Sequence, residues 1–110
     1  MITNVKPKRV YVINDSCHDY SEAESFGELV FLTKGKINKL ATARMYREFE
    51  AQLKDSSKED YILLSGLTIM IVIACCIFAK MHNRLNLLIF DVTRGNKKGF
   101  YRLRTINFED

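Results

Sequence analysis

Residues 61–79 form the longest run without a charged side chain, and this run limits the folds that are open to the chain. A helix needs about 20 apolar residues to cross a bilayer, and the run is close to that length. The dipeptide Ser65-Gly66 interrupts it after four apolar residues, so neither remaining part is long enough to span a membrane. We therefore predict a buried strand over 61–64 and a buried helix over 67–81. A membrane-spanning helix is the less favoured alternative.

The chain has 110 residues, of which 47% are apolar and 27% are charged. These values fit one compact domain over residues 1–110 and exclude intrinsic disorder, collagen-like repeats and low-complexity sequence. The three cysteines, Cys17, Cys75 and Cys76, are odd in number and two are adjacent, so they cannot build a disulfide framework. We therefore expect a reducing, cytoplasmic environment, and we place Cys75 and Cys76 in the core.

Short apolar runs alternate with helical patterns along the chain. The capping-box pattern S-x-x-E at Ser21 predicts a short helix that ends at Gly27. Apolar residues at spacings of three and four predict an amphipathic helix over 37–53, with Leu40 on its buried face. Strands are predicted over 9–13, 28–32, 61–64, 85–90 and 100–106.

The order of these elements is β-α-β-α-β-α-β-β. Strands that alternate with helices, and that are apolar throughout, are typical of a parallel sheet covered on both faces. The turn over 94–99 is too short for a parallel crossover, so the last strand must run antiparallel at the edge of the sheet. We predict an α/β fold, a three-layer, Rossmann-like or flavodoxin-like single domain with a mainly parallel sheet and an antiparallel C-terminal edge hairpin.

The polar loops after the predicted strands are the candidate binding site, because open α/β sheets bind ligands outside the carboxyl ends of their strands. The small residues Ser65 and Gly66 would let the backbone approach an anion such as a phosphate. The loops supply ten candidate residues for binding a nucleotide or another phosphorylated ligand: Asn14, Asp15, Ser16, His18, Thr33, Lys34, Gly35, Ser65, Gly66 and Thr68.

Turn formation and helix capping are the alternative explanation for these ten residues, and each of them suits such a role. The chain contains neither of the two glycine-rich phosphate-binding motifs, G-x-G-x-x-G and G-x-x-x-x-G-K-[ST]. Turns and caps are therefore the favoured interpretation, and we predict no cofactor.

Cys17 and His18 are adjacent and suggest nucleophilic catalysis, since a nearby helix start lowers a thiol pKa and an imidazole can act as the base. Neighbouring side chains seldom face each other, however, so we expect no catalytic residue. Asp15 and Asp19 could hold Mg²⁺, but an Asx turn and a helix cap explain them better. The spacing of the two histidines and three cysteines matches no metal site, and we predict none.

The net charge of +4 is concentrated near the C-terminus. Residues 80–110 hold seven Lys and Arg against three Asp and Glu, whereas residues 1–60 hold ten of each. A basic ribbon with aromatic residues between its cations can bind nucleic acid. Cations on an edge strand also keep it from pairing with other chains, and we favour this explanation. The candidate nucleic-acid or partner surface comprises Arg94, Lys97, Lys98, Arg102 and Arg104.

Three segments of the sequence, 11–21, 26–33 and 60–68, carry a resemblance to known proteins. They begin with YVIND, FGELV and DYILL, and they resemble small uncharacterised proteins encoded by tailed bacteriophages. The resemblance covers most of the chain and implies a phage origin, which would place the protein in the cytoplasm of a bacterial host. It implies no activity, although short phage reading frames often encode accessory proteins that bind host or phage components.

We consider three functions for such a chain. The leading hypothesis is a phage accessory protein, not an enzyme, that binds a host or phage macromolecule. The alternative is a module that binds a nucleotide or phosphorylated ligand, and the last is a nucleotide-processing enzyme built on Asp15, Cys17, His18 and Asp19. Self-association is expected, because the helix over 67–81 offers more apolar surface than one small sheet covers. Strand-end loops that converge on a pocket favour a small ligand, whereas a flat surface favours a protein partner.

Overall fold

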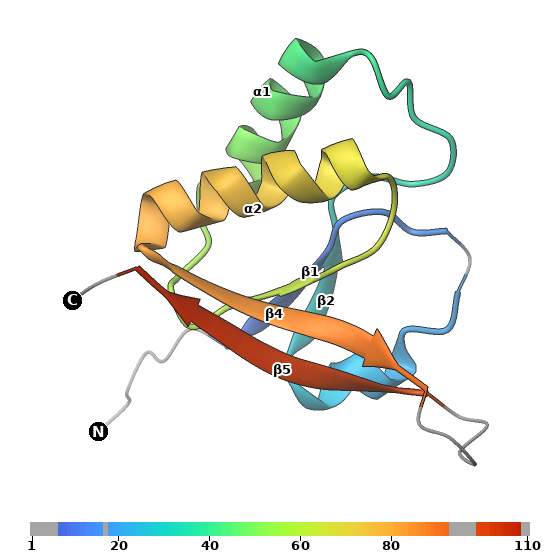
Figure 1. Ribbon diagram of the computed structural model, residues 1–110, viewed down its shortest axis with the longest axis vertical. Coiled ribbons are helices and arrows are strands. Elements are labelled where there is room, and N and C mark those ends of the chain that lie inside the picture. Colours follow the sequence, from blue (N-terminus) through green and yellow to red (C-terminus); the bar gives the residue numbers. More distant parts are fainter. Residues whose placement is uncertain (1–6, 17, 93–98, 109–110) are drawn as a thin grey trace.

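Five strands form one sheet in the structure, a computed structural model that describes residues 7–16, 18–92 and 99–108 (Figure 1). The strands are β1 (Arg9–Val12), β2 (Glu28–Phe31), β3 (Tyr61–Leu63), β4 (Arg84–Asp91) and β5 (Phe100–Asn107). Their order across the sheet is β2-β1-β3-β4-β5. The pairs β1–β2, β1–β3 and β3–β4 are parallel, and the pair β4–β5 is antiparallel.

Two α-helices, α1 (Thr42–Leu53) and α2 (Thr68–His82), pack against each other on one face of the sheet (Figure 1). On the opposite face, the described part of the chain has one covering element, the 3₁₀ helix η1 (Ser21–Ser25), drawn in light blue. The prediction of one α/β domain with a mainly parallel sheet and an antiparallel edge strand is confirmed. The strand order is that of flavodoxin-like sheets, except that the last strand is antiparallel.

The predicted start of the short helix near Ser21 is confirmed, but the capping role of Ser21 and the start of the predicted helix over 37–53 are wrong. Ser21 is the first residue of η1 rather than its cap, and its amide donates a hydrogen bond of 2.9 Å to the Asp19 carboxylate. α1 begins at Thr42 rather than near residue 37, because the Asn38 side chain accepts a hydrogen bond of 3.0 Å from the Leu40 amide and forms a local turn. Leu40, which we expected on the buried face, is therefore 80% exposed.

The sheet separates two apolar clusters. On the helical face, Phe49 of α1 and Phe78 of α2 pack in one cluster with Tyr11 of β1. On the other face, Tyr20 and Val12 belong to a second cluster that includes the buried side of η1. The central strands β1 and β3 are therefore buried on both faces, which explains why residues 10–12 and Tyr61–Leu63 hold no charged side chain.

The uncharged stretch 61–79 divides into β3 and α2 as predicted, with Ser65 and Gly66 between them. Among the described residues, no helix has both the length and the apolar character that crossing a membrane requires. The prediction that both helix cysteines lie in the core is wrong for Cys76, which is exposed on the outer side of α2. Cys75 is half-buried, and burial raises the pKa of its thiol to about 11.

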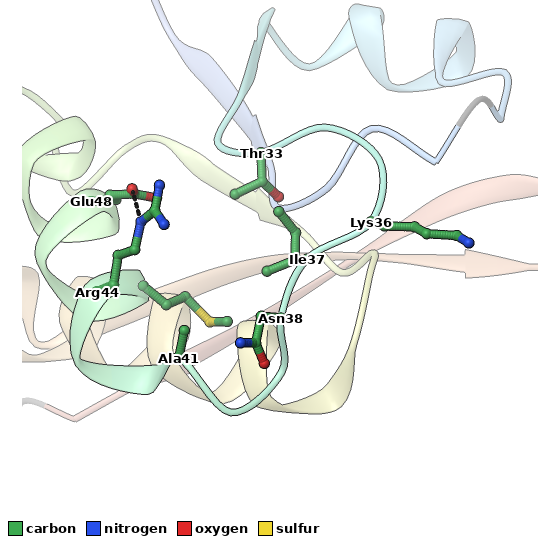
Figure 2. A pocket seen from close by; sticks show the side chains of 8 residues that line it. Thr33, Lys36, Ile37, Asn38, Ala41, Arg44 and Glu48 are labelled. Atoms are coloured by element: carbon green, nitrogen blue, oxygen red, sulfur yellow. Dashed lines mark hydrogen bonds and ion pairs between the residues drawn. The ribbon is translucent and has the colours of Figure 1, made fainter.

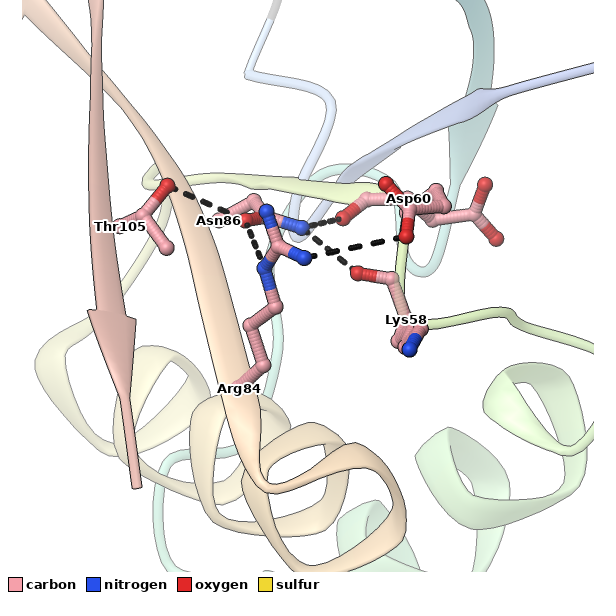
Figure 3. Close-up of polar contacts among 6 residues, drawn as sticks. Lys58, Asp60, Arg84, Asn86 and Thr105 are labelled. Carbon is pink, nitrogen blue, oxygen red and sulfur yellow. Dashed lines mark hydrogen bonds and ion pairs between the residues drawn. The ribbon is translucent and has the colours of Figure 1, made fainter. Parts of the chain in front are cut away.

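Asn86 connects β4 to its neighbours at the amino end of the parallel strands (Figure 3). Its buried amide nitrogen donates to the carbonyl oxygens of Lys58 (2.8 Å) and Asp60 (2.9 Å). Its oxygen accepts hydrogen bonds from Arg84 Nε (3.0 Å) and Thr105 Oγ1 (3.2 Å). The hydrogen-bonding capacity of the Asn86 amide is thus filled, so Asn86 stabilises the junction of β3, β4 and β5 and has no donor or acceptor left for a ligand.

His82, the last residue of α2, connects the ends of the two helices. Its Nε2 lies 2.8 Å from Ser56 Oγ, which itself donates to the Leu53 carbonyl oxygen (2.6 Å). The imidazole therefore donates its proton from Nε2 to Ser56. The ring also packs on Phe78, with 4.5 Å between ring centroids. Burial lowers the pKa of His82, because it disfavours the charged ring more than the negative charge of Asp60 favours it.

This lowered pKa predicts that mild acid weakens the fold. The unfolded chain takes up a proton at His82 near the ordinary pKa of about 6.5, whereas the folded chain resists protonation until a lower pH. The contribution of His82 to stability should be complete above about pH 6.5 and decrease below it. We expect the urea midpoint of the parent chain to fall between about pH 7 and about pH 5, and the midpoint of His82→Gln to fall by less. Equal falls in the two proteins would contradict this role of His82.

Candidate functional site

The loops that follow β1 and β3 meet at the carboxyl edge of the sheet. β1 leads to β2 on one side and β3 leads to β4 on the other, so the chain changes direction between these two central strands. Open α/β sheets bind ligands in the crevice that such a change of direction creates. We call this place the switch-point crevice. Ser16 and His18 after β1 and Gly66 after β3 lie at its centre.

A buried asparagine, Asn14, holds the loops around the crevice in place. Its Nδ2 donates to the Gly35 carbonyl oxygen (3.1 Å) and to Ser16 Oγ (3.2 Å). Its Oδ1 accepts a hydrogen bond from Thr33 Oγ1 (3.0 Å), which also lies 2.7 Å from the Ile13 carbonyl oxygen. The Asn14 residue is only 6% exposed. Its carboxamide therefore connects the end of β1 to the loop after β2.

The backbone of Asn14 is bound from two further directions. Ser65 Oγ accepts a hydrogen bond from the Asn14 amide and donates one to the Asn14 carbonyl oxygen, both at 3.1 Å. Tyr20 OH donates to the same carbonyl oxygen (3.1 Å) and accepts from the Ser16 amide (3.0 Å). We call Asn14, Tyr20, Thr33 and Ser65 the Asn14 network. This network connects the end of β1 to the loops after β2 and β3 and to the segment before η1.

Gly66 lies against this network in a conformation that favours glycine. Its φ angle is +93°, in the region that residues with a side chain rarely adopt. A Cβ atom at this position would lie 2.8 Å from Asn14 Cβ and 3.0 Å from Met70 Sδ. The absence of a side chain therefore allows the chain to pass close to Asn14 as it turns from β3 into α2.

One side of the crevice is a hollow of about 550 Å³ with aromatic and aliphatic walls. Phe90 and Tyr101 stand opposite each other on β4 and β5, with ring centroids 5.3 Å apart. Gly99 leaves room for the Phe90 ring, because a Cβ there would lie 1.9 Å from Phe90 Cζ. Burial raises the pKa of Tyr101, so its phenol keeps its proton at neutral pH. We call this the aromatic hollow, and its other lining residues are Ser16, His18, Asp19, Tyr20, Leu63, Leu64, Ser65, Gly66 and Ile71.

The other side of the crevice is a hollow of about 530 Å³ between the loops after β1, β2 and β3. It shares Ser16, His18 and Gly66 with the aromatic hollow, so the two adjoin. Lys36 is exposed at its wall and has no ion-pair partner within residues 7–16, 18–92 and 99–108. We call this the loop hollow, and its other lining residues are Asn14, Gly35, Ile37, Leu67 and Met70.

A third hollow, of about 210 Å³, lies between the loop after β2 and the first turns of α1 (Figure 2). Arg44 and Glu48 form an ion pair at its wall, with Nε and Oε1 3.0 Å apart. The Lys36 side chain points away from this pair (Figure 2). Small-ligand sites usually measure about 300–1,000 Å³. This hollow is therefore less suited to a ligand than the two that form the crevice.

The ten residues predicted to bind a ligand fall into groups with different roles. Six of them line the crevice: Asn14, Ser16, His18, Gly35, Ser65 and Gly66. Two of these six, Asn14 and Ser65, have polar groups bound within the Asn14 network, as has Thr33. The structure thus brings these seven residues together, but Asn14, Thr33 and Ser65 position the loops.

The remaining three predicted residues lie at the margin of the crevice or away from it. Asp15 and Lys34 form an isolated parallel bridge that extends the pairing of β1 with β2. Thr68, exposed at the start of α2, lines neither hollow of the crevice. The turn-and-cap interpretation therefore accounts for part of the predicted set.

The residues considered for catalysis and metal binding are placed only in part. Cys17, the first member of the Cys17 and His18 pair, lies outside the described residues. Asp19 forms an Asx turn just before η1, and hydrogen bonds from Ser21 lower the pKa of its carboxyl group. Within the described part of the chain, no three His, Cys, Asp or Glu side chains gather in a way that could hold a metal ion.

The predicted basic surface is only partly described, because Arg94, Lys97 and Lys98 lie outside the described residues. Arg102 forms an ion pair with Asp91, and its guanidinium carbon lies 4.7 Å from the centroid of the Phe100 ring. Arg104 donates from Nη1 to the Leu103 carbonyl oxygen (2.8 Å). Both arginines are exposed on β5, but their charged groups already have partners within the chain. Nucleic-acid binding stays a prediction.

The aromatic wall of the crevice and its cation, Lys36, are not among the site residues predicted from the sequence. Phe90 and Tyr101 come together only through the register of β4 and β5, which leaves no pattern in the sequence. Lys36 has a local signal, because residues 33–47 hold five Lys and Arg and no Asp or Glu. This cluster is hidden in the total for the first 60 residues, where the charges balance.

These features define a small α/β protein with a ligand-sized crevice at the topological switch point of its sheet. Residues 8–102 match the family described as Phage Pam3 gp32-like protein, and the chain belongs to this family. The match confirms the resemblance to small phage proteins seen in the sequence. Searches among curated proteins and among solved structures gave no match.

The geometry predicts that Asn14 is the main polar support of the crevice. Asn14→Ala removes the carboxamide that binds Thr33, Gly35 and Ser16, and it leaves hydrogen-bonding groups without partners. We expect the free energy of unfolding, measured by urea titration, to fall by about 2 kcal/mol. The control is Asn38→Ala, because the exposed Asn38 side chain makes only a local turn. A loss in Asn14→Ala no larger than that in the control would show that the network does not support the loops.

Proposed function

We propose that this phage-family protein binds a small nucleotide or phosphorylated ligand in the switch-point crevice. The observation that carries the proposal is that the loops after β1, β2 and β3 converge on two adjoining hollows instead of a flat surface. Each hollow has a volume within the usual range for small-ligand sites, about 300–1,000 Å³. A standard protein interface needs about 800 Å² of surface on each partner, and a concave edge built from short loops suits a small ligand better.

The construction of the crevice supports this proposal. The Asn14 network connects its loops through hydrogen bonds that need no ligand. A site that is formed before binding loses less conformational entropy when the ligand arrives. Ser16 and His18 are exposed where the two hollows join, so their polar groups can contact a ligand there.

Binding without a chemical step is the simpler role for these residues. The enzyme hypothesis relied on Asp15, Cys17, His18 and Asp19 as a group. Of these, Asp15 bridges to Lys34 through its backbone, and the Asp19 carboxylate accepts a hydrogen bond from the Ser21 amide. We therefore propose ligand binding rather than nucleotide processing. The cytoplasmic location expected from the sequence stays a prediction.

A thermal melt with added ligands tests the binding proposal. We expect one or more mononucleotides at millimolar concentration to raise the Tm of the parent chain, because a ligand that binds only the folded state stabilises it. Ser16→Trp should abolish the rise, since a large side chain at Ser16 fills the place where the hollows join. Ser25→Trp is the control, because Ser25 is exposed on η1 outside both hollows. No rise with any mononucleotide or sugar phosphate, or the same rise in both variants, would refute the proposal.

A second candidate function is binding of a macromolecule, including a second copy of the chain, through the edge strand β5. Within the described residues, β5 pairs with β4 on one side and has no strand on the other. Ile106 and Phe108 at its end are 45% and 55% exposed. An edge strand with exposed apolar side chains can pair with another chain.

Sedimentation of the pure protein tests self-association through β5. We expect the parent chain to sediment as a dimer at micromolar concentration and Ile106→Asp to sediment as a monomer, because a buried carboxylate disfavours the interface. Val72→Asp is the matched control, since Val72 is 48% exposed on α2. Dissociation of the control alone would instead support the surface of the predicted 67–81 helix. A monomeric parent would contradict self-association through either surface.

A further inference from the structure

We propose that the ligand of the switch-point crevice is a mononucleotide-like molecule, with its ring in the aromatic hollow and its anionic end in the loop hollow. This inference rests on the proposed function and adds to it the ligand class and the direction in which the ligand lies.

The aromatic hollow has the surfaces that a flat ring requires. The Phe90 ring is half exposed and stands 5.3 Å from the Tyr101 ring, in an edge-to-face arrangement. Gly99 leaves the space in which the Phe90 ring sits, so this part of the wall is fixed by the backbone. Leu63 and Ile71 supply apolar surface beside the rings. Every nucleobase can stack on such aromatic side chains, whatever hydrogen-bond donors and acceptors lie on the edge of the base.

The charges of the crevice decide where an anionic group lies. The carboxylate of Asp19 lines the aromatic hollow, and the hydrogen bonds from Ser21 favour its charged form, so a phosphate is repelled there. The loop hollow instead has Lys36, which belongs to a stretch of five cations and no acid over residues 33–47. Because Lys36 points away from the Arg44 and Glu48 pair, its ammonium group is not used by Glu48 (Figure 2).

The junction of the hollows allows one molecule to occupy both. Ser16, His18 and Gly66 line the two hollows together. Gly66 has no side chain, so it leaves the passage open, while Ser16 and His18 offer a hydroxyl and an imidazole to the middle of a ligand. A sugar with hydroxyl groups, placed between a base and a phosphate, fits this order of chemical groups.

Three probes separate this inference from the proposed function: adenosine 5′-monophosphate, adenosine and ribose 5-phosphate. In isothermal titration at low salt, we expect the nucleotide to bind at least about tenfold more tightly than either fragment, because each fragment fills one hollow. A guanine or pyrimidine nucleotide in place of the adenine nucleotide would support the same assignment. If ribose 5-phosphate binds as tightly as every nucleotide, the ring assignment is wrong, although the crevice still binds a ligand. If no probe binds, the proposed function fails as well.

Two pairs of variants test the direction of the ligand. Lys36→Gln should weaken the nucleotide and ribose 5-phosphate several-fold and leave adenosine unchanged, while Lys39→Gln, which makes the same charge change outside the lining, should have no effect. Phe90→Leu and Tyr101→Leu should weaken the nucleotide and adenosine about tenfold and leave ribose 5-phosphate unchanged. Both aromatic positions are changed, so that the test does not depend on one variant. Phe90 is the more exposed of the two, so Phe90→Leu carries less risk to the fold. The opposite pattern, with adenosine sensitive to Lys36→Gln and ribose 5-phosphate sensitive to the aromatic variants, would overturn the assignment.

Discussion

The loops at the carboxyl edge of the sheet depend on the hydrogen bonds that the buried carboxamide of Asn14 makes. It lies at the end of a strand in the middle of the sheet, where β1 has β2 on one side and β3 on the other. A buried amide that lacks partners is costly, so such a group is retained where its hydrogen bonds are all made. Here those bonds reach the loop after β2 through Gly35 and Thr33, and Ser65 binds the Asn14 backbone from the loop after β3. Three loops that are distant in sequence therefore share one support.

The opposite edge of the sheet uses the same chemistry for a different result. Asn86 also buries its amide and fills its hydrogen bonds, and Asp60 beside it accepts bonds from the Arg9 and Ser57 amides. At that end the parallel strands start, and the polar groups bind one another (Figure 3). At the Asn14 end, the chain leaves the central strands in opposite directions, and the loops enclose the crevice between them. Buried polar residues thus connect the strands at one edge of the sheet and support the loops around the crevice at the other.

The sequence predicted the fold better than the site, and the reason is physical. The central strands β1 and β3 are buried on both faces and leave apolar runs, whereas the mostly exposed β5 is indicated by the turn before it and by its alternating residues. Every strand and the antiparallel edge could therefore be inferred. The start of α1 could not, because the Asn38 side chain forms a turn that competes with the helical spacing of its neighbours. The crevice was predicted where chain order suffices, as at Ser16 and Gly66, which follow strands. The contact between Phe90 and Tyr101 was not predicted, because it depends on the pairing register of β4 and β5, which cannot be read from either residue alone.

The contact between Asn14 and Ser65 also has a consequence for how the molecule is assembled. It joins residues 51 positions apart, whereas the contact between Asn14 and Thr33 spans 19. Closing a longer loop costs more chain entropy, and contacts between distant residues slow folding. β1 and β2 can pair early, but the crevice is complete only when β3 has docked and Ser65 has reached Asn14. During synthesis, a nascent chain that ends before β3 therefore lacks the crevice, and under the proposed function a ligand would stabilise only the chain that has finished folding.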